Sequence, residues 1–388
     1  MSDSVTLPST SRTTAAVATL AVDVAAGFVA PQQVGGAEVM LYNLVDGLRV
    51  ATSGPVRVHH RAAHPLRRQT PGCEYRPIRA GNRFAADAVV GVTGQADLVL
   101  YPNYFTPPVR RSPALSVIHD VQYRYFPEHF SARKRRWLAA AHAHTVARAD
   151  VVVAISESVR EDLLRIYGSR ARRVQVVPNP IDFTRFGVAD EPDEPDDQTP
   201  GTIRALVPPP SRGELVAVAA QYPHKNLDTL IAGHAAYRAS GGRLDLTLIG
   251  TPRAQLVGSG AWGPEQVSGG DGVRHLGHVD DRTLGHRLRH ATAFLHPSLF
   301  EGFGMPVAEA LGLGVPTICN ALPPLLEIAG DLANLCHEPR DAAAWASWMH
   351  RAERGDLRRP SAAEAARIRT RYAPASVAAR YLDVVRRA

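Results

Sequence analysis

The chain has 388 residues, of which 45% are hydrophobic and 21% are charged, and its 44 Lys and Arg against 37 Asp and Glu give a net charge of +7. This composition excludes a disordered or fibrous chain, and the length predicts two domains. The basic balance favours an anionic partner such as a nucleotide, a phosphorylated acceptor or a membrane surface. Nucleic acid is not expected, because no basic strand carries the interleaved aromatic residues of such binding sites.

The cysteines and the N-terminal segment favour a cytoplasmic protein. Three cysteines lack the C-x-x-C spacing of a zinc site and do not suggest a disulfide framework. Residues 1–14 are polar and lack the basic and then apolar order of a signal peptide, so we expect a flexible N-terminus. The apolar run 15–30 is interrupted by Asp23 and Gly27 and is short for a membrane-spanning helix. Peripheral contact with the inner face of a membrane remains open.

Residues 15–186 alternate β-branched runs with amphipathic stretches. The runs that predict strands are 16–23, 56–60, 97–101, 115–118, 151–155 and 174–177. Between them, 37–50, 131–149 and 157–167 have helical spacing, the last behind Ser156 as N-cap. Such alternation predicts a parallel sheet covered by helices on both faces, that is, a Rossmann-like domain.

A second domain follows a linker. Residues 187–213 are acidic and Pro-rich, which is typical of a linker. The alternation restarts in residues 214–374, with a helix expected over 225–239. Residues 375–388 read as a helix, which we expect to pack back on the first domain. The predicted fold class is therefore α/β, with two Rossmann-like domains and a cleft between them that is suited to a ligand.

The strongest local signal is the segment from Glu301 to Glu309. Gly302-Phe303-Gly304 predicts a turn, and Met305-Pro306 starts a helix, because proline is tolerated in a first turn. Free N–H groups and the positive dipole end at such a helix start suit a phosphate. Glu309, one turn into the helix, could bind a ribose diol, and Glu301 could approach a sugar on the phosphate. From spacing alone, a plain strand–turn–helix with a solvated Glu is an equal alternative.

This segment resembles the Glu-x7-Glu motif of the family 4 (group 1) retaining glycosyltransferases. Further strings follow the order of that family from about residue 15 to 385. They are Val34-Gly35-Gly36-Ala37-Glu38, Val117-Ile118-His119-Asp120, Ala149-Asp150 with Ile155-Ser156-Glu157-Ser158, Val177-Pro178-Asn179-Pro180-Ile181-Asp182 and Tyr222-Pro223-His224-Lys225-Asn226-Leu227. The resemblance implies the GT-B fold, in which the first domain binds the acceptor and the second binds a nucleotide sugar across a cleft.

The first-domain strings supply further candidate residues. Gly35 and Gly36 open a helix after a strand, where the backbone can approach a donor phosphate or can simply form a tight turn. His119 follows a strand, at the edge where open α/β sheets bind ligands, and the resemblance puts it beside the transferred sugar. Asp120 and Ser156 are assigned to the acceptor side, although Asp120 also suits a structural role at a helix start.

Lys225 is the expected cation for the donor diphosphate. A cation at a helix start opposes the helix dipole unless an anion lies between them, and the resemblance assigns the diphosphate to this residue. Many family members carry an Arg about five residues earlier, where this chain has Val218-Ala219-Ala220-Gln221. Either another Arg, such as Arg253, or the helix dipole would then balance the remaining charge.

No metal or other cofactor is expected, because the chain lacks an Asp-x-Asp motif near a strand end. The basic run Arg133-Lys134-Arg135-Arg136 is more typical of a solvated helix face than of a lipid-binding or phosphate-binding one.

The predicted function is metal-independent transfer of a hexose or deoxyhexose from a nucleotide-diphosphate sugar to an acceptor hydroxyl, with retention. His119, Lys225 and Glu301 are the catalytic candidates. Donor contacts are expected at Gly35, Gly36, Gly302, Phe303, Gly304, Met305, Pro306 and Glu309. GDP-mannose is the leading donor, since Tyr222-Pro223-His224-Lys225-Asn226 resembles mannosyl-transferring members. The acceptor is a saccharide, a lipid-linked sugar or a small natural product, held by loops in 60–95 and 102–113. A non-catalytic GT-B partner subunit and a nucleotide-sugar 2-epimerase are the alternatives.

Overall fold

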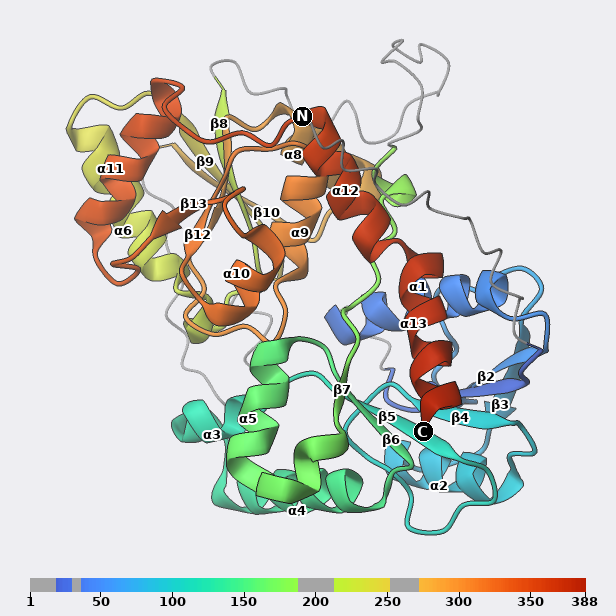
Figure 1. Cartoon of the computed structure of the whole chain (residues 1–388). Coiled ribbons are helices and arrows are strands. Elements are labelled where there is room, and N and C mark those ends of the chain that lie inside the picture. The colour runs from blue at the N-terminus through green and yellow to red at the C-terminus, as the bar shows by residue number, and fades with distance from the viewer. Residues whose placement is uncertain (1–18, 30–35, 188–212, 252–271) are drawn as a thin grey trace, which may run out of the picture.

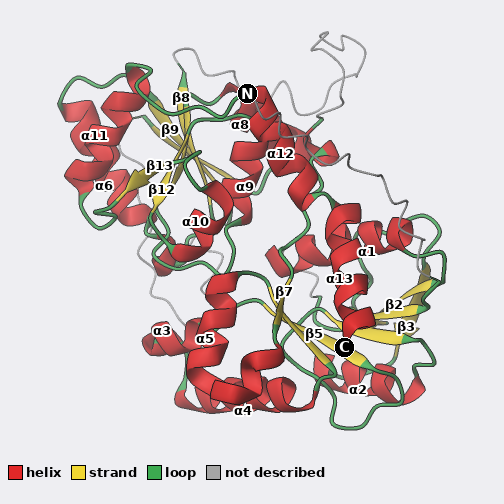
Figure 2. Ribbon diagram, in the orientation of Figure 1, coloured by secondary structure: helices red, strands yellow, loops and turns green. Residues whose placement is uncertain are grey.

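Two α/β domains, one above the other in Figure 1, make up the computed structural model, which describes residues 19–29, 36–187, 213–251 and 272–388. Figure 2 shows helices on both sides of the strands in each domain. All strand pairs are parallel, as expected for short, continuous apolar runs joined by helical crossovers. The predicted fold class is confirmed.

The first domain has a seven-stranded sheet with the order β3-β2-β1-β4-β5-β6-β7. Its strands are β1 (Val22–Ala25), β2 (Val56–Arg61), β3 (Glu74–Ile78), β4 (Leu98–Tyr101), β5 (Ala114–Ile118), β6 (Val151–Ala154) and β7 (Gln175–Val176). Its helices and 3-10 turns are α1 (Gly36–Ala51), α2 (Arg83–Thr93), α3 (Gln122–Tyr125), η1 (Pro127–His129), α4 (Ala132–Arg148), α5 (Glu157–Tyr167) and η2 (Gly168–Arg173). A further 3-10 turn, η3 (Thr184–Phe186), leads away from this domain.

The second domain has a six-stranded sheet with the order β10-β9-β8-β11-β12-β13. Its strands are β8 (Glu214–Val218), β9 (Asp245–Ile249), β10 (Val273–Gly277), β11 (Ala293–His296), β12 (Thr317–Asn320) and β13 (Asn334–Cys336). Its helices and turn are η4 (Pro223–Lys225), α6 (Leu227–Ala239), α8 (Asp281–His290), α9 (Met305–Gly312), α10 (Pro323–Ala329), α11 (Ala342–Glu353) and α12 (Ala362–Tyr372). Apolar residues of α6 and α11 form one buried cluster with the strands.

The last helix, α13 (Pro374–Arg387), returns to the first domain and packs on α1, as Figure 1 shows in red over blue. Gly47 of α1 permits this packing, since a Cβ there would lie 2.1 Å from the carbonyl oxygen of Pro374. Just before α13, the carbonyl of Tyr372 accepts a hydrogen bond of 2.7 Å from the backbone N–H of Ile181. The two segments that run between the domains therefore touch each other.

The structure differs from the sequence predictions at several elements. The first strand lies at 22–25 and not at 16–23, of which 16–18 are outside the described residues. The expected loop 60–95 contains β3 and α2. The helix expected from 225 begins at Leu227, because Asn226 takes a left-handed conformation with φ 55° that ends the turn η4. Residues 1–14, expected to be flexible, and most of the expected linker 187–213 lie outside the described residues.

Candidate active site between the two domains

Each sheet has one point at which the order of its strands reverses. This switch point lies between β1 and β4 in the first sheet and between β8 and β11 in the second. Ligands bind in the crevice at the carboxyl ends of the strands at such a point, because the connections on its two sides leave in opposite directions. In the second domain, the segments after β8 and β11 hold Lys225 and Glu301.

The carboxyl edges of the two sheets meet at Gly302. A Cβ on Gly302 would lie 2.0 Å from the carbonyl oxygen of His119, so only glycine allows this approach. The hydroxyl of Ser156 donates a 2.7 Å hydrogen bond to the carbonyl of Gly302. Ser156 is also the N-cap of α5, as predicted, and is buried. Its hydroxyl thus joins the domains, and its assignment to the acceptor side stays a prediction.

Glu301 is held as a carboxylate by two neighbours. Lys225 Nζ lies 2.7 Å and His296 Nε2 lies 2.8 Å from the same oxygen, Oε1. Burial alone would raise the pKa of Glu301, but the Lys225 ammonium and the His296 hydrogen bond outweigh it and hold that pKa well below its ordinary value. Because both contacts use Oε1, Oε2 can accept a hydrogen bond from a sugar hydroxyl. His296, the last residue of β11, was not identified from the sequence.

Lys225 lies in η4, two residues before α6, and its side chain is 20% exposed. An ammonium has three N–H donors, so the bond to Glu301 leaves others for a phosphate. Next to it, His224 Nδ1 accepts a 2.9 Å hydrogen bond from Gln122 Nε2 of the first domain. Burial, aided by the Lys225 charge, lowers the pKa of His224 to about 3, so this residue is neutral near pH 7.

The turn 302–304 and the start of α9 adopt the predicted geometry. Gly304 is the N-cap with φ 107°, a left-handed conformation that favours glycine, and Pro306 lies in the first turn. The side chains of Phe303 and Met305 are buried, and the Phe303 ring packs against Tyr372 with the centroids 5.4 Å apart. These two residues can therefore meet a donor only through their backbone.

Glu309 is buried and paired with Arg185 of η3. Burial raises the pKa of Glu309, and the Arg185 guanidinium partly offsets that rise. Arg185 Nη1 also lies 3.0 Å from Asp281 Oδ1, at the start of α8. Glu309, the residue predicted to bind the ribose, is thus positioned by Arg185, which was not identified from the sequence. Its role toward a ribose stays a prediction.

His119 and Asp120 follow β5. His119 Nε2 lies 3.1 Å from the carbonyl oxygen of Pro102, which can only accept, so Nε2 carries the hydrogen and Nδ1 keeps its lone pair. Burial lowers the pKa of His119 and keeps the ring neutral. Asp120 Oδ1 accepts a 2.9 Å hydrogen bond from the Gln122 N–H, the structural role that the sequence allowed.

The glycine pair ahead of α1 is only partly described. Gly36 is the first residue of α1 and is exposed, and no described atom lies within 4 Å of the place that a Cβ would take. Gly35 lies outside the described residues, as does Arg253. The donor contacts expected at Gly35 and Gly36 stay predictions.

A further contact between the domains comes from Glu327 of α10. Its two carboxylate oxygens accept hydrogen bonds of 2.8 Å from the backbone N–H groups of Glu157 and Ser158. These N–H groups belong to the first turn of α5, where a helix has no internal partners for them and favours negative charge. Glu327 therefore holds the second domain against the first beside the Gly302 contact.

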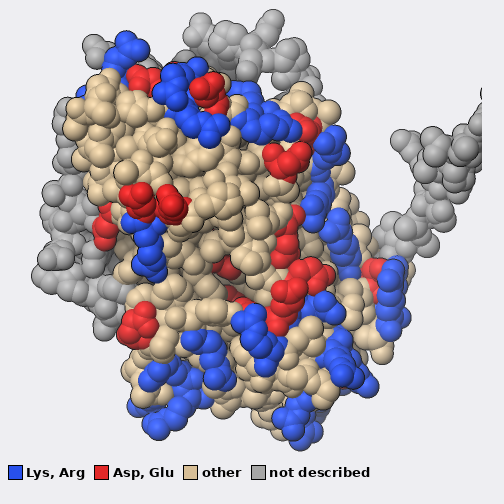
Figure 3. Space-filling view, turned by 60° about the vertical axis from the view of Figure 1, so that its left-hand side comes forward, with Lys and Arg blue, Asp and Glu red and all other residues tan. Residues whose placement is uncertain are grey.

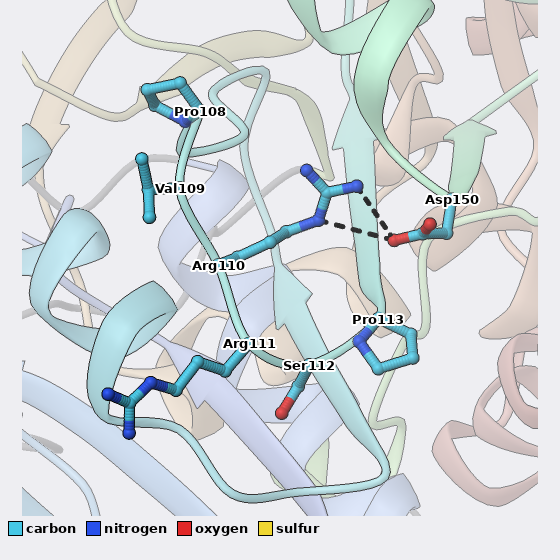
Figure 4. Close-up of a pocket in the computed structure, with 7 residues that line it drawn as sticks. All are labelled: Pro108, Val109, Arg110, Arg111, Ser112, Pro113 and Asp150. Carbon is cyan, nitrogen blue, oxygen red and sulfur yellow. Dashed lines mark hydrogen bonds and ion pairs between the residues drawn. The ribbon is translucent and has the colours of Figure 1, made fainter.

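A separate hollow of about 500 Å³ lies at the amino ends of the strands of the first sheet, opposite the carboxyl edge that faces the second domain (Figure 4). Residues 108–113 and Asp150 line it, and Arg110 is paired with Asp150 at 3.0 Å. These residues precede β5 and β6, so the hollow is at the amino ends of the strands, away from the switch point. By contrast, Figure 3 shows a hollow between the domains with carboxylates on its floor and basic side chains around it.

Within the described ranges, no group of three or more His, Cys, Asp or Glu side chains is arranged to hold a metal ion. In the same residues, no helix combines the length and the apolar character that crossing a membrane requires. The expectation of a metal-free reaction stays a prediction.

Two parallel-sheet α/β domains with facing carboxyl edges are the arrangement of the GT-B class of glycosyltransferase folds, and the Lys–Glu–His cluster lies at one of these edges. Comparison with protein families agrees. Residues 203–369 match the family described as "Glycosyl transferases group 1", and residues 34–185 match "Glycosyltransferase Family 4". The chain belongs to the family 4, group 1 glycosyltransferases.

Curated relatives and solved structures support the same assignment. The chain is 26% identical to O-antigen chain mannosyltransferase B of Escherichia coli over 63% of its length, and 29% identical to a D-inositol 3-phosphate glycosyltransferase of Xylanimonas cellulosilytica over 62%. It spans 61% and 57% of those relatives' own length. Sucrose-phosphate synthase of Thermosynechococcus elongatus shares the fold with a TM-score of 0.70 at 18% identity, covering 95% of this chain and 98% of that one. Anabaena HepE in complex with UDP-glucose has a TM-score of 0.67 at 17% identity, covering 95% and 100%.

Proposed function

We propose that this chain transfers a hexose or deoxyhexose from a nucleotide-diphosphate sugar to an acceptor hydroxyl, with retention and without a metal ion. The observation that carries the proposal is the cluster of Lys225, Glu301 and His296, which holds an ionised carboxylate and a cation at the switch point facing the first domain. A carboxylate suits sugar hydroxyls, and the adjacent ammonium suits the diphosphate that carries the sugar.

The donor diphosphate is assigned to Lys225 and the start of α9. Gln221 stands near the place of the additional Arg that many family members carry, and its Nε2 lies 2.9 Å from His275 Nδ1. One cation and the positive end of α9 would therefore stabilise the diphosphate. Glu309 would accept hydrogen bonds from the ribose, with its carboxylate positioned by Arg185.

The reaction would proceed on one face of the sugar. The bond between C1 and the phosphate oxygen breaks, a bond between C1 and the acceptor oxygen forms on the same face, and the acceptor proton passes to the departing phosphate. Lys225 and the α9 N–H groups stabilise the negative charge that develops there. Glu301 Oε2 holds the sugar, and neutral His119 faces it from the first domain. Contact between the domains at Gly302 would exclude water, which otherwise hydrolyses the donor.

The name of the E. coli relative supports mannose, and GDP-mannose is the leading donor. The UDP-glucose held by HepE supports a UDP-sugar as the second choice. A thermal-shift screen with GDP, UDP, dTDP and ADP tests both, since a nucleotide that binds the folded state raises the melting temperature by mass action. Failure of all four nucleotides to stabilise the protein would contradict the proposal.

Two other functions are separated by one assay with the corresponding nucleotide sugar. A glycosyltransferase hydrolyses its donor slowly when no acceptor is present. A 2-epimerase would convert the donor into an isomer, and a non-catalytic partner subunit would bind the nucleotide and leave the donor intact. Release of free sugar together with the nucleoside diphosphate is the expected result.

Peripheral membrane contact is proposed through the start of α4. Arg133, Lys134 and Arg136 are exposed there, and the Trp137 side chain beside them is 37% exposed. Basic residues beside an exposed aromatic ring suit an anionic bilayer surface. Sedimentation with phosphatidylglycerol vesicles at low and high salt tests this contact, and binding that does not respond to salt would contradict it.

A further inference from the structure

The switch point of the first sheet carries two arginines. Arg61 is the last residue of β2, and its Nε donates a 2.9 Å hydrogen bond to the carbonyl of Gly27. Its Nη2 donates to the carbonyl of Val29 at 3.2 Å. Arg61 thus fixes the residues that follow β1, and both of its hydrogen-bond partners are neutral carbonyls, which leave its positive charge unpaired by them.

Arg83 is the first residue of α2, where a cation is unfavourable next to the positive end of the helix. No acidic residue lies in this first turn. The guanidinium lies over the rings of Phe84 and Tyr104, at 4.5 and 5.3 Å from their centroids, and donates to the Tyr104 hydroxyl. This stacking fixes the Arg83 guanidinium in place, and the aromatic rings do not neutralise its positive charge.

The two arginines belong to one site, because both elements converge on Gly27. A Cβ on Gly27 would lie 3.0 Å from Asp87 Oδ1 and 3.2 Å from the carbonyl oxygen of Arg83, while Arg61 bonds the Gly27 carbonyl. The proximity of Arg83 also lowers the pKa of Arg61, after the larger effect of burial.

Asp87 is a buried carboxyl group near both arginines and interacts with their charges without a direct ion pair. It is 1% exposed, its Oδ1 has no hydrogen-bond partner among the described atoms, and its Oδ2 lies 3.5 Å from Asn103 Nδ2. Burial raises the pKa of Asp87 to about 7 despite both arginines, so its carboxyl is partly neutral near pH 7. In the part of the chain that the structure describes, neither arginine has a carboxylate within 4.0 Å.

We propose that Arg61 and Arg83 bind a phosphomonoester group of the acceptor. Nη1 of Arg61, which makes neither of its two carbonyl bonds, the guanidinium of Arg83 and the start of α2 match a dianion with three free oxygens better than a single carboxylate. The inference rests on the proposed function, since it places this group beside the hydroxyl that attacks the donor. Tyr104, which Arg83 contacts, is two residues from Pro102, whose carbonyl binds His119, and His119 packs on Gly302.

Titration with glycerol 3-phosphate by calorimetry tests the proposal, with the donor site filled by the nucleoside diphosphate that stabilises the protein most. Arg83→Met is expected to weaken binding of the phosphate about tenfold or more, because a charge-assisted bidentate contact is lost. Arg83→Lys keeps the charge and should recover part of the affinity. Arg111→Met, which removes one charge at the opposite sheet edge (Figure 4), should change it less than about twofold.

Arg61→Met provides a second, independent variant with the same expected loss. The melting-temperature rise with nucleotide shows that each variant is folded. Equal affinity of wild type and Arg83→Met for both phosphate probes, glycerol 3-phosphate and a short-chain phosphatidic acid, would overturn the inference, and so would acetate binding as tightly as either probe. If no nucleotide binds, the proposed function fails, and the phosphate titration can still be made on the nucleotide-free protein.

A phosphomonoester can come from a soluble sugar phosphate or from a lipid phosphate. Short-chain phosphatidic acid, titrated beside glycerol 3-phosphate, distinguishes them. A loss confined to glycerol 3-phosphate in Arg83→Met assigns a soluble acceptor, and a loss confined to the lipid assigns a lipid-linked one. Both results support the phosphate site.

Discussion

The switch points of the two sheets differ in how their charges are balanced. At the second sheet, Lys225 is paired with Glu301, and Arg185 is paired with Glu309 and Asp281. At the first, Arg61 and Arg83 bind neutral carbonyl and hydroxyl groups. Where each cation already has a carboxylate partner, a charged ligand must replace that partner in order to bind. Where the cations have no carboxylate partner, the ligand itself supplies the opposite charge. Under the proposed function, the donor and the acceptor would therefore be recognised in different ways.

Lys225→Met would break the balanced side most strongly. It removes the cation that faces both the carboxylate of Glu301 and the proposed diphosphate. We expect kcat to fall about a hundredfold or more, the typical effect of losing one preorganised charge contact in a transition state. Steady-state rates with the nucleotide sugar measure it, and the exposed Lys134→Met serves as the matched control. Equal rates in both variants would remove Lys225 from the site.

Asp87→Asn tests the charge balance at the switch point of the first sheet, near Arg61 and Arg83. The folded-state pKa of about 7 exceeds the ordinary 3.8, so the stability contribution of Asp87 is complete below pH 3.8 and is lost as pH rises through 7. Asparagine does not ionise, so the variant should be more stable than wild type above pH 7, by at most about 4 kcal/mol.

This advantage should shrink toward pH 4, which urea unfolding at pH 8, 6 and 4 measures. Exposed Asp356→Asn provides the control, with a small effect at each pH. A stability gain from Asp87→Asn that is independent of pH would contradict an unbalanced charge at this edge.

Arg185→Met tests how the balanced side positions Glu309. Without the guanidinium, burial should raise the pKa of Glu309 further, and a neutral carboxyl accepts hydrogen bonds from a ribose less well. We expect the donor KM to rise about tenfold, the size of one charged hydrogen bond, with a steeper rise as pH falls from 8 to 6. Arg282→Met, an exposed neighbour on α8, should leave KM unchanged at each pH. A change in kcat alone would argue against a positioning role.

Glu327→Gln should have the smallest effect, because it alters the contact between the two sides and neither site itself. Glutamine replaces one of the two acceptor oxygens by an NH2 group, which cannot accept from its N–H group of α5, so we expect a loss of about 1 kcal/mol in unfolding free energy. Chemical denaturation measures it, with the exposed Glu128→Gln as control. A loss of equal size in both variants would mean that the contact does not hold the domains together.

The sequence predicts the parts of the site that lie in continuous strings. The Glu301–Glu309 turn, Lys225 and His119 follow strands whose apolar runs are plain. Arg185 and Glu327 escape such analysis, because Glu309 is 124 residues from Arg185 and Ser158 is 169 residues from Glu327, and only the fold brings these partners together. The strand β3 was missed because it is an edge strand with mostly exposed side chains and a proline, so its sequence, EYRPI, has no apolar run. His296 reads as the end of a buried strand, and only its bond to Glu301 gives it a role.

The hydrogen bond between Ile181 and Tyr372 has a mechanical consequence. The polypeptide leaves the first domain at one of these residues and comes back at the other, so both crossings share a single pivot. Rotation of one domain about this pivot would open and close the space between the domains. The contact between Gly302 and His119 would break on opening and form on closing. A protease that cuts one of the crossings would leave the halves joined through the other, and the pair would part only after a second cut.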